Sequence, residues 1–351
     1  METLSDSNEA GDLSSDIPFY KIVLTGGPCG GKTTALARVS SYLRERGFEV
    51  FTCPEAFTIL ASNGFSIDYF ATEGMDIVAQ TTVLNWQQTM EDGMESILKA
   101  RRLPAVLLCD RGLQDGAAYM NKEKWQRLLK ERGLDVTDVR DGRYNAVFHM
   151  VTAAEGAETY YTLDNNDART ETSEQAREMD KKTQRAWVGH PRMYVLDNST
   201  DFEGKLQRLV EFVAKLVGLP TNLSRRTAKF LLKKGPSLDV FPPEIDYHLF
   251  EVEKVYLVTQ LSSSQFQEEY SFIRRRTSVA KDGAHMGSVY GMTTVQITRD
   301  GHTLERKRII TRREYTSSLR QRDLTRHIVR QHRICFLYKH QSFNIHVSIH
   351  G

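Results

Sequence analysis

Short apolar runs alternate with longer stretches of helical periodicity over the first two thirds of the chain. The apolar runs predict β-strands at residues 20–24, 49–53, 105–109, 146–151 and 193–196. The longer stretches place apolar residues three or four positions apart and predict helices at residues 32–46, 77–99, 122–132, 173–188 and 202–217. Because this alternation requires crossover connections, we predict a parallel sheet with helices on both faces.

The pattern of apolar and polar residues changes after Gly218, where the helical periodicity ends. Four prolines follow within residues 220–243 and predict a linker over residues 219–244. From Phe250 onward, β-type runs are separated by Asp-Gly turns and predict a mostly β domain over residues 245–351. The α/β domain is then expected at residues 19–218, and residues 1–18, which carry five acidic and no basic side chains, are expected to be a disordered tail.

Charge divides the chain in the same way. Residues 221–351 hold 22 Lys and Arg against 12 Asp and Glu, although the whole chain has a net charge of only +2. An anionic ligand for the second half is favoured, and solvated surface charge is the alternative. No apolar run approaches the ~20 residues of a membrane span. The four scattered cysteines are typical of a reduced, cytosolic protein.

The strongest motif matches G-x-x-x-x-G-K-[ST] between a predicted strand and a predicted helix. Glycines let backbone N–H groups converge on phosphate oxygens, and the helix N-terminus adds its dipole. Lys32 is expected to reach the β- and γ-phosphates, and Thr33 to ligate Mg²⁺. The residues leave ATP and GTP both open. The motif consists of Gly26, Gly27, Pro28, Cys29, Gly30, Gly31, Lys32 and Thr33.

Three further side chains are candidates for the chemistry. Asp110 ends a buried strand and is predicted to act through the metal. Arg111, directly after it, is predicted to contact the acceptor or phosphate, with a surface arginine as the alternative. Glu55 follows the second strand and could accept a proton from an attacking hydroxyl, or merely favour a helix N-terminus.

Two more segments suggest ligand contacts. A polar segment carries Arg169, Arg177 and Arg185, each eight residues from the next. Lid segments of nucleotide kinases carry arginines that neutralise transferring phosphate, although a solvated helix face is the more common explanation for at least one of these three. Asp197 and Asn198 end the last strand and are placed near the nucleobase.

The second half carries charged alternations on its predicted strands. Arg274 and Arg276 share one strand face, and Arg306, Lys307 and Arg308 follow in a later strand. Arginine matches phosphate oxygens bidentately, so an anion site is favoured over a sheet with one solvated face.

The chain resembles a family of two-part proteins that act in membrane-channel trafficking. Its first half resembles the AAA-type P-loop domain shared with nicotinamide riboside kinase-like proteins, and its second half resembles the triphosphate-tunnel (CYTH) fold. Tunnel enzymes begin with E-x-E-x-K, whereas here Glu251 and Glu253 are followed by Val255. Basic residues also replace later metal-binding acids, so anion binding without triphosphate hydrolysis is expected. The matching stretches are residues 24–34, 52–58, 108–112, 186–191 and 251–256.

The resemblance implies a fold and a set of partners. It implies an α/β P-loop NTPase followed by an incomplete, truncated tunnel-like barrel, because the chain stops soon after the strand-like residues 343–349. Thr34 lies in the matched nucleotide stretch. Implied ligands are GTP with Mg²⁺, and phosphoinositide or another anionic lipid. A membrane channel or its vesicle is the implied cargo, and nucleic acid is not an expected partner.

The leading hypothesis is therefore a cytoplasmic GTP-binding adaptor that contacts endomembranes or endocytic vesicles peripherally. The alternative is a small-molecule or nucleoside-type P-loop kinase with Glu55 as the base. Slow GTP hydrolysis and kinase-like transfer are both left open.

Overall fold

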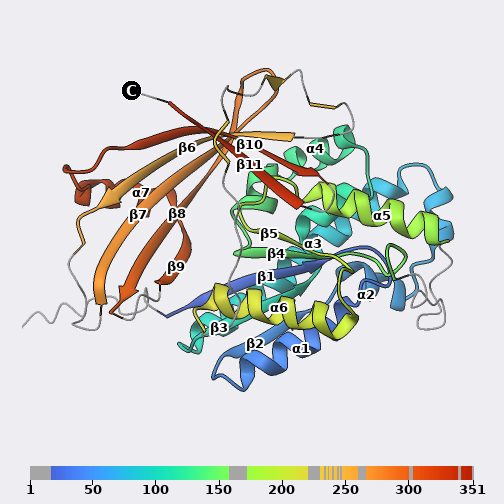
Figure 1. Ribbon diagram of the computed structural model, residues 1–351. Coiled ribbons are helices and arrows are strands. Elements are labelled where there is room, and N and C mark those ends of the chain that lie inside the picture. The colour runs from blue at the N-terminus through green and yellow to red at the C-terminus, as the bar shows by residue number, and fades with distance from the viewer. Residues whose placement is uncertain are drawn as a thin grey trace, which may run out of the picture.

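The computed structural model describes residues 17–157, 172–219, 247–259, 266–299, 303–338 and 341–349, together with a few positions between 230 and 245. The predicted acidic tail, Arg169 and most of the predicted linker lie outside these residues. Figure 1 shows two β-sheets, one carrying most of the helices and one that curves beside it.

The first half contains a five-stranded parallel sheet in the order β2-β3-β1-β4-β5. All five strands expected from the apolar runs are confirmed. The central strand β1 pairs with β3 on one side and with β4 on the other. The strands are β1 (Phe19–Thr25), β2 (Glu49–Cys53), β3 (Ala105–Asp110), β4 (Ala146–Met150) and β5 (Met193–Leu196).

Helices cover both faces of this sheet, as the alternating pattern predicts. One core packs apolar residues of α1 (Lys32–Arg44) and α6 (Phe202–Val217) against β1, β3 and β4. The core on the other face contains residues of α3 (Met75–Ala100) and α4 (Lys122–Glu131) with Trp187, which follows α5 (Ser173–Ala186). Each helix lies close to its predicted range.

Four short elements of the first half had no sequence prediction. They are α2 (Ala56–Ser62), the 3₁₀ segments η2 (Ile67–Ala71) and η3 (Leu113–Ala118), and the π-type turn η4 (Thr137–Asp141). Each has seven residues or fewer, too few for a periodic apolar face. These short segments matter because Glu55 lies directly before α2, and Asp110 ends the strand that precedes η3.

The second half is a six-stranded antiparallel sheet in the order β11-β10-β6-β7-β8-β9. A mostly β second half is therefore confirmed, and among the described residues the sheet is open, with β11 and β9 at its edges. Its elements are β6 (Tyr247–Leu257), β7 (Phe266–Val279), β8 (His285–Thr298), β9 (Thr303–Ile310), α7 (Arg312–Ser318), η7 (Leu319–Gln321), β10 (Val329–Tyr338) and β11 (Gln341–Ser348).

The two faces of this sheet have different neighbours. On one face, Val255, Ile273 and Ile310 pack with Tyr315 of α7. On the other face, Phe250 and Arg276 contact residues of η4 and the α5–β5 loop. The second sheet is thus joined to the first half through buried contacts. Within the part of the chain that is described, no helix is long and apolar enough to cross a membrane.

Candidate functional site

The predicted P-loop connects β1 to α1, as its motif requires. Its glycines are explained by close backbone packing: a Cβ on Gly26 would overlap the carbonyl oxygen of Met150, and Gly26 has φ +139°. A Cβ on Gly30 would lie 2.6 Å from the same oxygen. The end of β4 therefore presses the loop into a shape that only glycine permits at these positions.

Lys32 is the first residue of α1, and its ammonium folds back over the loop. Its Nζ donates to the carbonyl oxygens of Gly26 at 3.1 Å and Gly27 at 3.0 Å. Burial and the nearby Arg111 lower the pKa of Lys32 to about 8. The negative charge of a bound phosphate would stabilise the buried ammonium. This position therefore suits the predicted phosphate contact.

Asp180 of α5 holds the beginning of the loop, a role that the sequence did not reveal. Its Oδ1 accepts hydrogen bonds from the N–H groups of Gly27 at 2.7 Å and Thr152 at 3.1 Å. Its Oδ2 lies 3.2 Å from Nε2 of His149 on β4. The carboxylate is only 1% exposed, and these hydrogen bonds offset the free-energy cost of burying its charge.

Asp110 fits the predicted contact with a metal or its water. Its Oδ1 is buried without a hydrogen-bond partner among the described residues. Burial raises the pKa of Asp110, even though Lys32 attracts its charged form. Thr33 is exposed in the same cleft. Mg²⁺ typically takes one or two protein ligands together with phosphate oxygens and water, and this donor set suits it.

Glu55 and Arg111, predicted separately, form an ion pair. Arg111 Nε lies 2.6 Å from Oε1 of Glu55, and its NH1 lies 3.8 Å from Asp115. Glu55 also occupies the N-cap position of α2, so both of its expected placements occur together. Burial alone would raise the pKa of Glu55, but Arg111 and Lys32 outweigh it and leave the pKa below its usual value. Glu55 is therefore an anion facing the P-loop.

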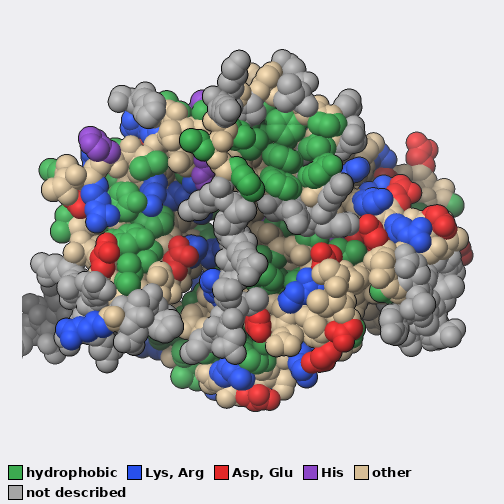
Figure 2. All heavy atoms as spheres, viewed as in Figure 1, with side chains coloured by type: hydrophobic (Ala, Val, Ile, Leu, Met, Phe, Trp, Pro, Cys, Tyr) green, Lys and Arg blue, Asp and Glu red, His purple; other side chains and the backbone are tan. Residues whose placement is uncertain are grey.

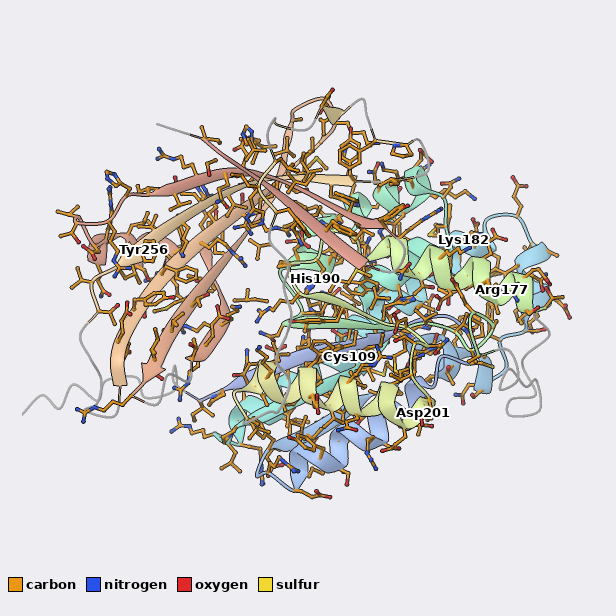
Figure 3. The ribbon with its side chains drawn as sticks, in the orientation of Figure 1. Cys109, Arg177, Lys182, His190, Asp201 and Tyr256 are labelled. Carbon is orange, nitrogen blue, oxygen red and sulfur yellow. The ribbon has the colours of Figure 1, made fainter. Side chains whose placement is uncertain are left out.

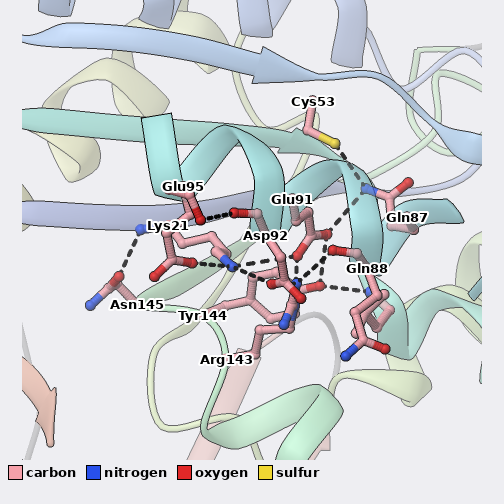
Figure 4. Close-up of polar contacts among 12 residues, drawn as sticks. Lys21, Cys53, Gln87, Gln88, Glu91, Asp92, Glu95, Arg143, Tyr144 and Asn145 are labelled. Carbon is pink, nitrogen blue, oxygen red and sulfur yellow. Dashed lines mark hydrogen bonds and ion pairs between the residues drawn. The ribbon is translucent and has the colours of Figure 1, made fainter. Parts of the chain in front are cut away.

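A buried polar network surrounds Gln87 and Glu91 of α3 (Figure 4). Gln87 of α3 accepts from the backbone N–H of Ala56 at 3.1 Å and donates to Glu91 at 3.1 Å. Glu91 is fully buried and also binds Arg143 at 2.7 Å and the Tyr144 hydroxyl at 3.0 Å. These contacts fix the start of α2, and with it the position of Glu55.

One cleft of about 1820 Å³ joins these groups. It is lined by residues 28–34 of the P-loop and by Glu55, Asp110 and Arg111. Its volume exceeds the roughly 300–1,000 Å³ of a typical ligand pocket. The cleft continues past Glu55 between apolar side chains of α2, η2 and α4, which include Phe57, Phe70 and Trp125. It thus has room for a nucleotide and a second molecule.

The expected lid and nucleobase residues are only partly at the cleft. Arg177 donates to the carbonyl oxygen of Ala154 at 2.6 Å, and Arg185 is exposed on the same helix. Figure 3 shows Arg177 and Lys182 on α5. Asn198 lines the cleft, where it binds the carbonyl oxygens of Thr152 and Glu155. Asp197 instead pairs with Arg208 at 2.9 Å.

The basic residues of the second half are split between locations. Arg276 is 4% exposed and pairs with Asp141 of η4 at 3.5 Å, so its guanidinium binds the first half rather than facing solvent. Arg274 and Lys307 line a small cavity at the same junction. Arg308 pairs with Glu314 at 3.7 Å, and Arg306 is exposed on the edge strand. Figure 2 shows basic and acidic side chains interspersed on the viewed face, not one basic patch.

Comparison with known proteins supports the first half of the prediction. A family model described as an AAA domain matches residues 21–205, which is more than half of the chain. Comparison with curated proteins gave no match. The likeness of the second half to the triphosphate-tunnel fold stays a prediction, because the family match ends before it. The matched range contains the P-loop, Glu55, Asp110 and Asp180, and the chain belongs to the AAA-domain family of P-loop nucleotide-binding proteins.

Proposed function

We propose that this protein transfers the γ-phosphoryl group of a nucleoside triphosphate to a small-molecule acceptor. The observation that carries the proposal is the Glu55–Arg111 pair at 2.6 Å, in a cleft that is lined both by the P-loop and by apolar side chains of α2, η2 and α4. GTP, which the family resemblance implies, is the proposed donor, and ATP is the competing one.

The chain's own groups suit such a transfer. Lys32 and the P-loop N–H groups hold the β- and γ-phosphates, and Thr33 with Asp110 holds Mg²⁺ or its water. When bound, Mg²⁺ neutralises charge on the phosphates. Glu55, kept ionised by Arg111, accepts the proton of the acceptor hydroxyl. Arg111 stabilises the charge on the transferred group.

The test uses purified full-length protein, γ-labelled GTP or ATP with Mg²⁺, and a panel of hydroxylated metabolites. Label should pass to an acceptor, and Glu55→Gln should slow transfer at least about tenfold while nucleotide affinity is kept, as for loss of a general base. Glu73→Gln, which removes an exposed carboxylate, is the matched control. Absence of any acceptor label, or an equal rate for Glu55→Gln and wild type, would refute the proposal.

A second candidate is a GTP-regulated adaptor that binds phosphoinositide and directs a membrane channel or its vesicle through endocytic compartments. What favours it is the excess of basic side chains in the second half, 17 Lys and Arg against 10 Asp and Glu in residues 245–351. It predicts flotation with phosphoinositide liposomes that changes between GTP and GDP. Flotation that is absent, or equal in both nucleotides, counts against it.

A further inference from the structure

A small cavity lies where the second sheet meets the first half. It measures about 30 Å³ and is lined from the first half by Asp141, His190 and Arg192, and from the second by Arg274, Arg276 and Lys307. Figure 3 places His190 between the two sheets. A buried water needs about 10–15 Å³, so the cavity accepts two atoms the size of oxygen.

The charges around this cavity do not balance. Asp141 is its only acidic lining residue among those described, and it already binds Arg140 through two hydrogen bonds of 2.8 and 2.9 Å as well as Arg276 at 3.5 Å. Neither Arg192 nor Arg274 has an acidic side chain within ion-pair distance in the described part of the chain. Two guanidinium groups at the junction therefore lack a direct acidic partner among the described residues, and Glu305, which is paired with Lys307, attracts both only from beyond ion-pair distance.

Neighbouring groups add to the imbalance. Among the described residues, the side-chain hydrogen bonds of Arg333 go to the neutral side chain of Gln331, at 3.0 and 3.3 Å. Burial together with Arg276, Arg333 and Arg192 lowers the pKa of Arg274 to about 9, which shows that its charge is held at a cost. Burial also lowers the pKa of His190 to about 3, so this ring is neutral and contributes no compensating or competing charge at neutral pH.

Outward-facing cations of the same sheet behave differently. Arg275, next to Arg274 on the opposite strand face, lies 3.4 Å from Glu253, which also pairs with Arg330 at 3.1 Å. Arg274 differs from Arg275 in lining the junction cavity, where no described acidic side chain lies within ion-pair distance of it. Water solvates exposed arginines such as Arg306, for which no acidic partner lies within ion-pair distance among the described residues, whereas Arg192 and Arg274 line a cavity at the junction.

We propose that Arg192, Arg274 and Lys307 form one binding site for a phosphate-bearing anion, shared between the two halves. Two phosphate oxygens enter the cavity and accept hydrogen bonds from Arg192 and Arg274, and Lys307, 37% exposed and paired with Glu305, stands at the rim. Arg276 pairs with Asp141 and donates to the Gly189 carbonyl oxygen, so we assign it to holding the junction together rather than to the ligand. The site deepens the adaptor candidate and does not depend on phosphoryl transfer.

Arg192 gives the sharpest test, because it belongs to the first half. Binding of tripolyphosphate and of inorganic phosphate to the full chain is measured by calorimetry, and flotation is measured with phosphoinositide, phosphatidylserine and neutral liposomes. All proteins carry Lys32→Ala, so that phosphate binding at the P-loop does not contribute. Arg192→Gln and Arg274→Gln are compared with Arg275→Gln, the adjacent arginine on the opposite face.

Arg192→Gln and Arg274→Gln should each weaken anion binding at least about tenfold, as expected for loss of one charge-assisted contact, and Arg275→Gln should not. Binding of the free phosphates alone identifies a soluble ligand, and preferential flotation with phosphoinositide identifies a lipid head group; either supports the site. No anion binding, or equal effects of Arg192→Gln and Arg275→Gln, overturns it. Nucleotide affinity of each arginine variant with Lys32 restored checks that the fold is intact, and reports on the P-loop separately.

Discussion

The carboxylate of Asp180 accepts a hydrogen bond from the backbone N–H of Gly27 at 2.7 Å, across 153 residues of sequence. This contact joins α5 to the P-loop. The other oxygen of the same carboxylate lies 3.2 Å from Nε2 of His149 on β4. A side chain on Gly27 would meet Cβ of Asp180 at 2.8 Å, so the glycine is required by this approach. The loop shape is therefore set jointly by its own sequence and by a helix far along the chain.

Replacing Asp180 should separate its hydrogen bonding from its charge. Asp180→Ala leaves two buried N–H groups without an acceptor, each costing about 1–3 kcal/mol, and should weaken both folding and nucleotide binding. Asp180→Asn keeps an acceptor oxygen and should retain most of both. Urea unfolding and calorimetry measure the two effects. Glu178→Ala, an exposed change on the same helix, is the control; equal behaviour of the Ala and Asn variants at position 180 would contradict this account.

Asp180 should also make stability depend on acid pH. Burial would raise its pKa, but His149 and the two N–H groups outweigh burial and leave the pKa of Asp180 below its unfolded value. Its stabilisation is then complete above about pH 4, the unfolded value, and is lost as pH falls through the folded pKa. Wild type should lose stability below about pH 4 more steeply than Asp180→Asn. Parallel curves for the two proteins would rule out this contribution.

Lys32→Ala should remove nucleotide binding without unfolding the protein. Lys32 is the first residue of α1, and its replacement leaves the buried apolar residues of that helix unchanged. The variant loses only the ammonium that is expected to contact the phosphates. A charge-assisted contact of this kind is worth about 1.5–3 kcal/mol, so affinity should fall at least about tenfold. Calorimetry measures it, with circular dichroism as the check on folding. Unchanged affinity in a folded variant would remove Lys32 from the site.

Asp110→Asn should weaken nucleotide binding mainly when Mg²⁺ is present. The unpartnered Oδ1 of Asp110 is the atom available to the metal or its water, and an amide is a poorer partner for a cation. Titrations with Mg²⁺ and with EDTA give the comparison. If the loss is the same in both, Asp110 acts on the loop itself and not through the metal.

Arg276→Met should destabilise the protein although Arg276 lies far from the P-loop. It removes the contact to Asp141, the bond to the Gly189 carbonyl oxygen, and the stacking of its guanidinium 3.3 Å from the Phe250 ring centroid. We expect the free energy of unfolding to fall by about 2–3 kcal/mol. This is less than the 3–5 kcal/mol expected when a buried charge loses its partner, because Arg140 still pairs with Asp141.

Arg275→Met is the matched control for that change. Arg275 is 46% exposed, and its pair with Glu253 should contribute at most about 1 kcal/mol. Chemical unfolding of both variants decides the matter. Equal losses would mean that the junction contributes nothing beyond surface charge.

The sequence alone determined the α/β architecture and the P-loop, because both depend on local signals. The apolar runs that became β1 to β5 and the glycine spacing before Lys32 can be recognised within short windows. Glu55, Asp110 and Arg111 were found for the same reason, since each follows a recognisable strand. The order β2-β3-β1-β4-β5, which places the ends of β2, β3 and β1 next to one another, came from the tertiary structure.

Only the tertiary structure decided which charged residues meet. Asp180 reaches Gly27, and Asp141 captures Arg276, across stretches of chain that no periodic pattern links. Arg274 and Arg276 share a strand face and both line the junction cavity, yet Arg276 pairs with Asp141 whereas Arg274 has no acidic partner within ion-pair distance among the described residues. The reason is physical: strand and helix periods fix the side of an element on which a residue lies, whereas burial and pairing depend on what packs against that side.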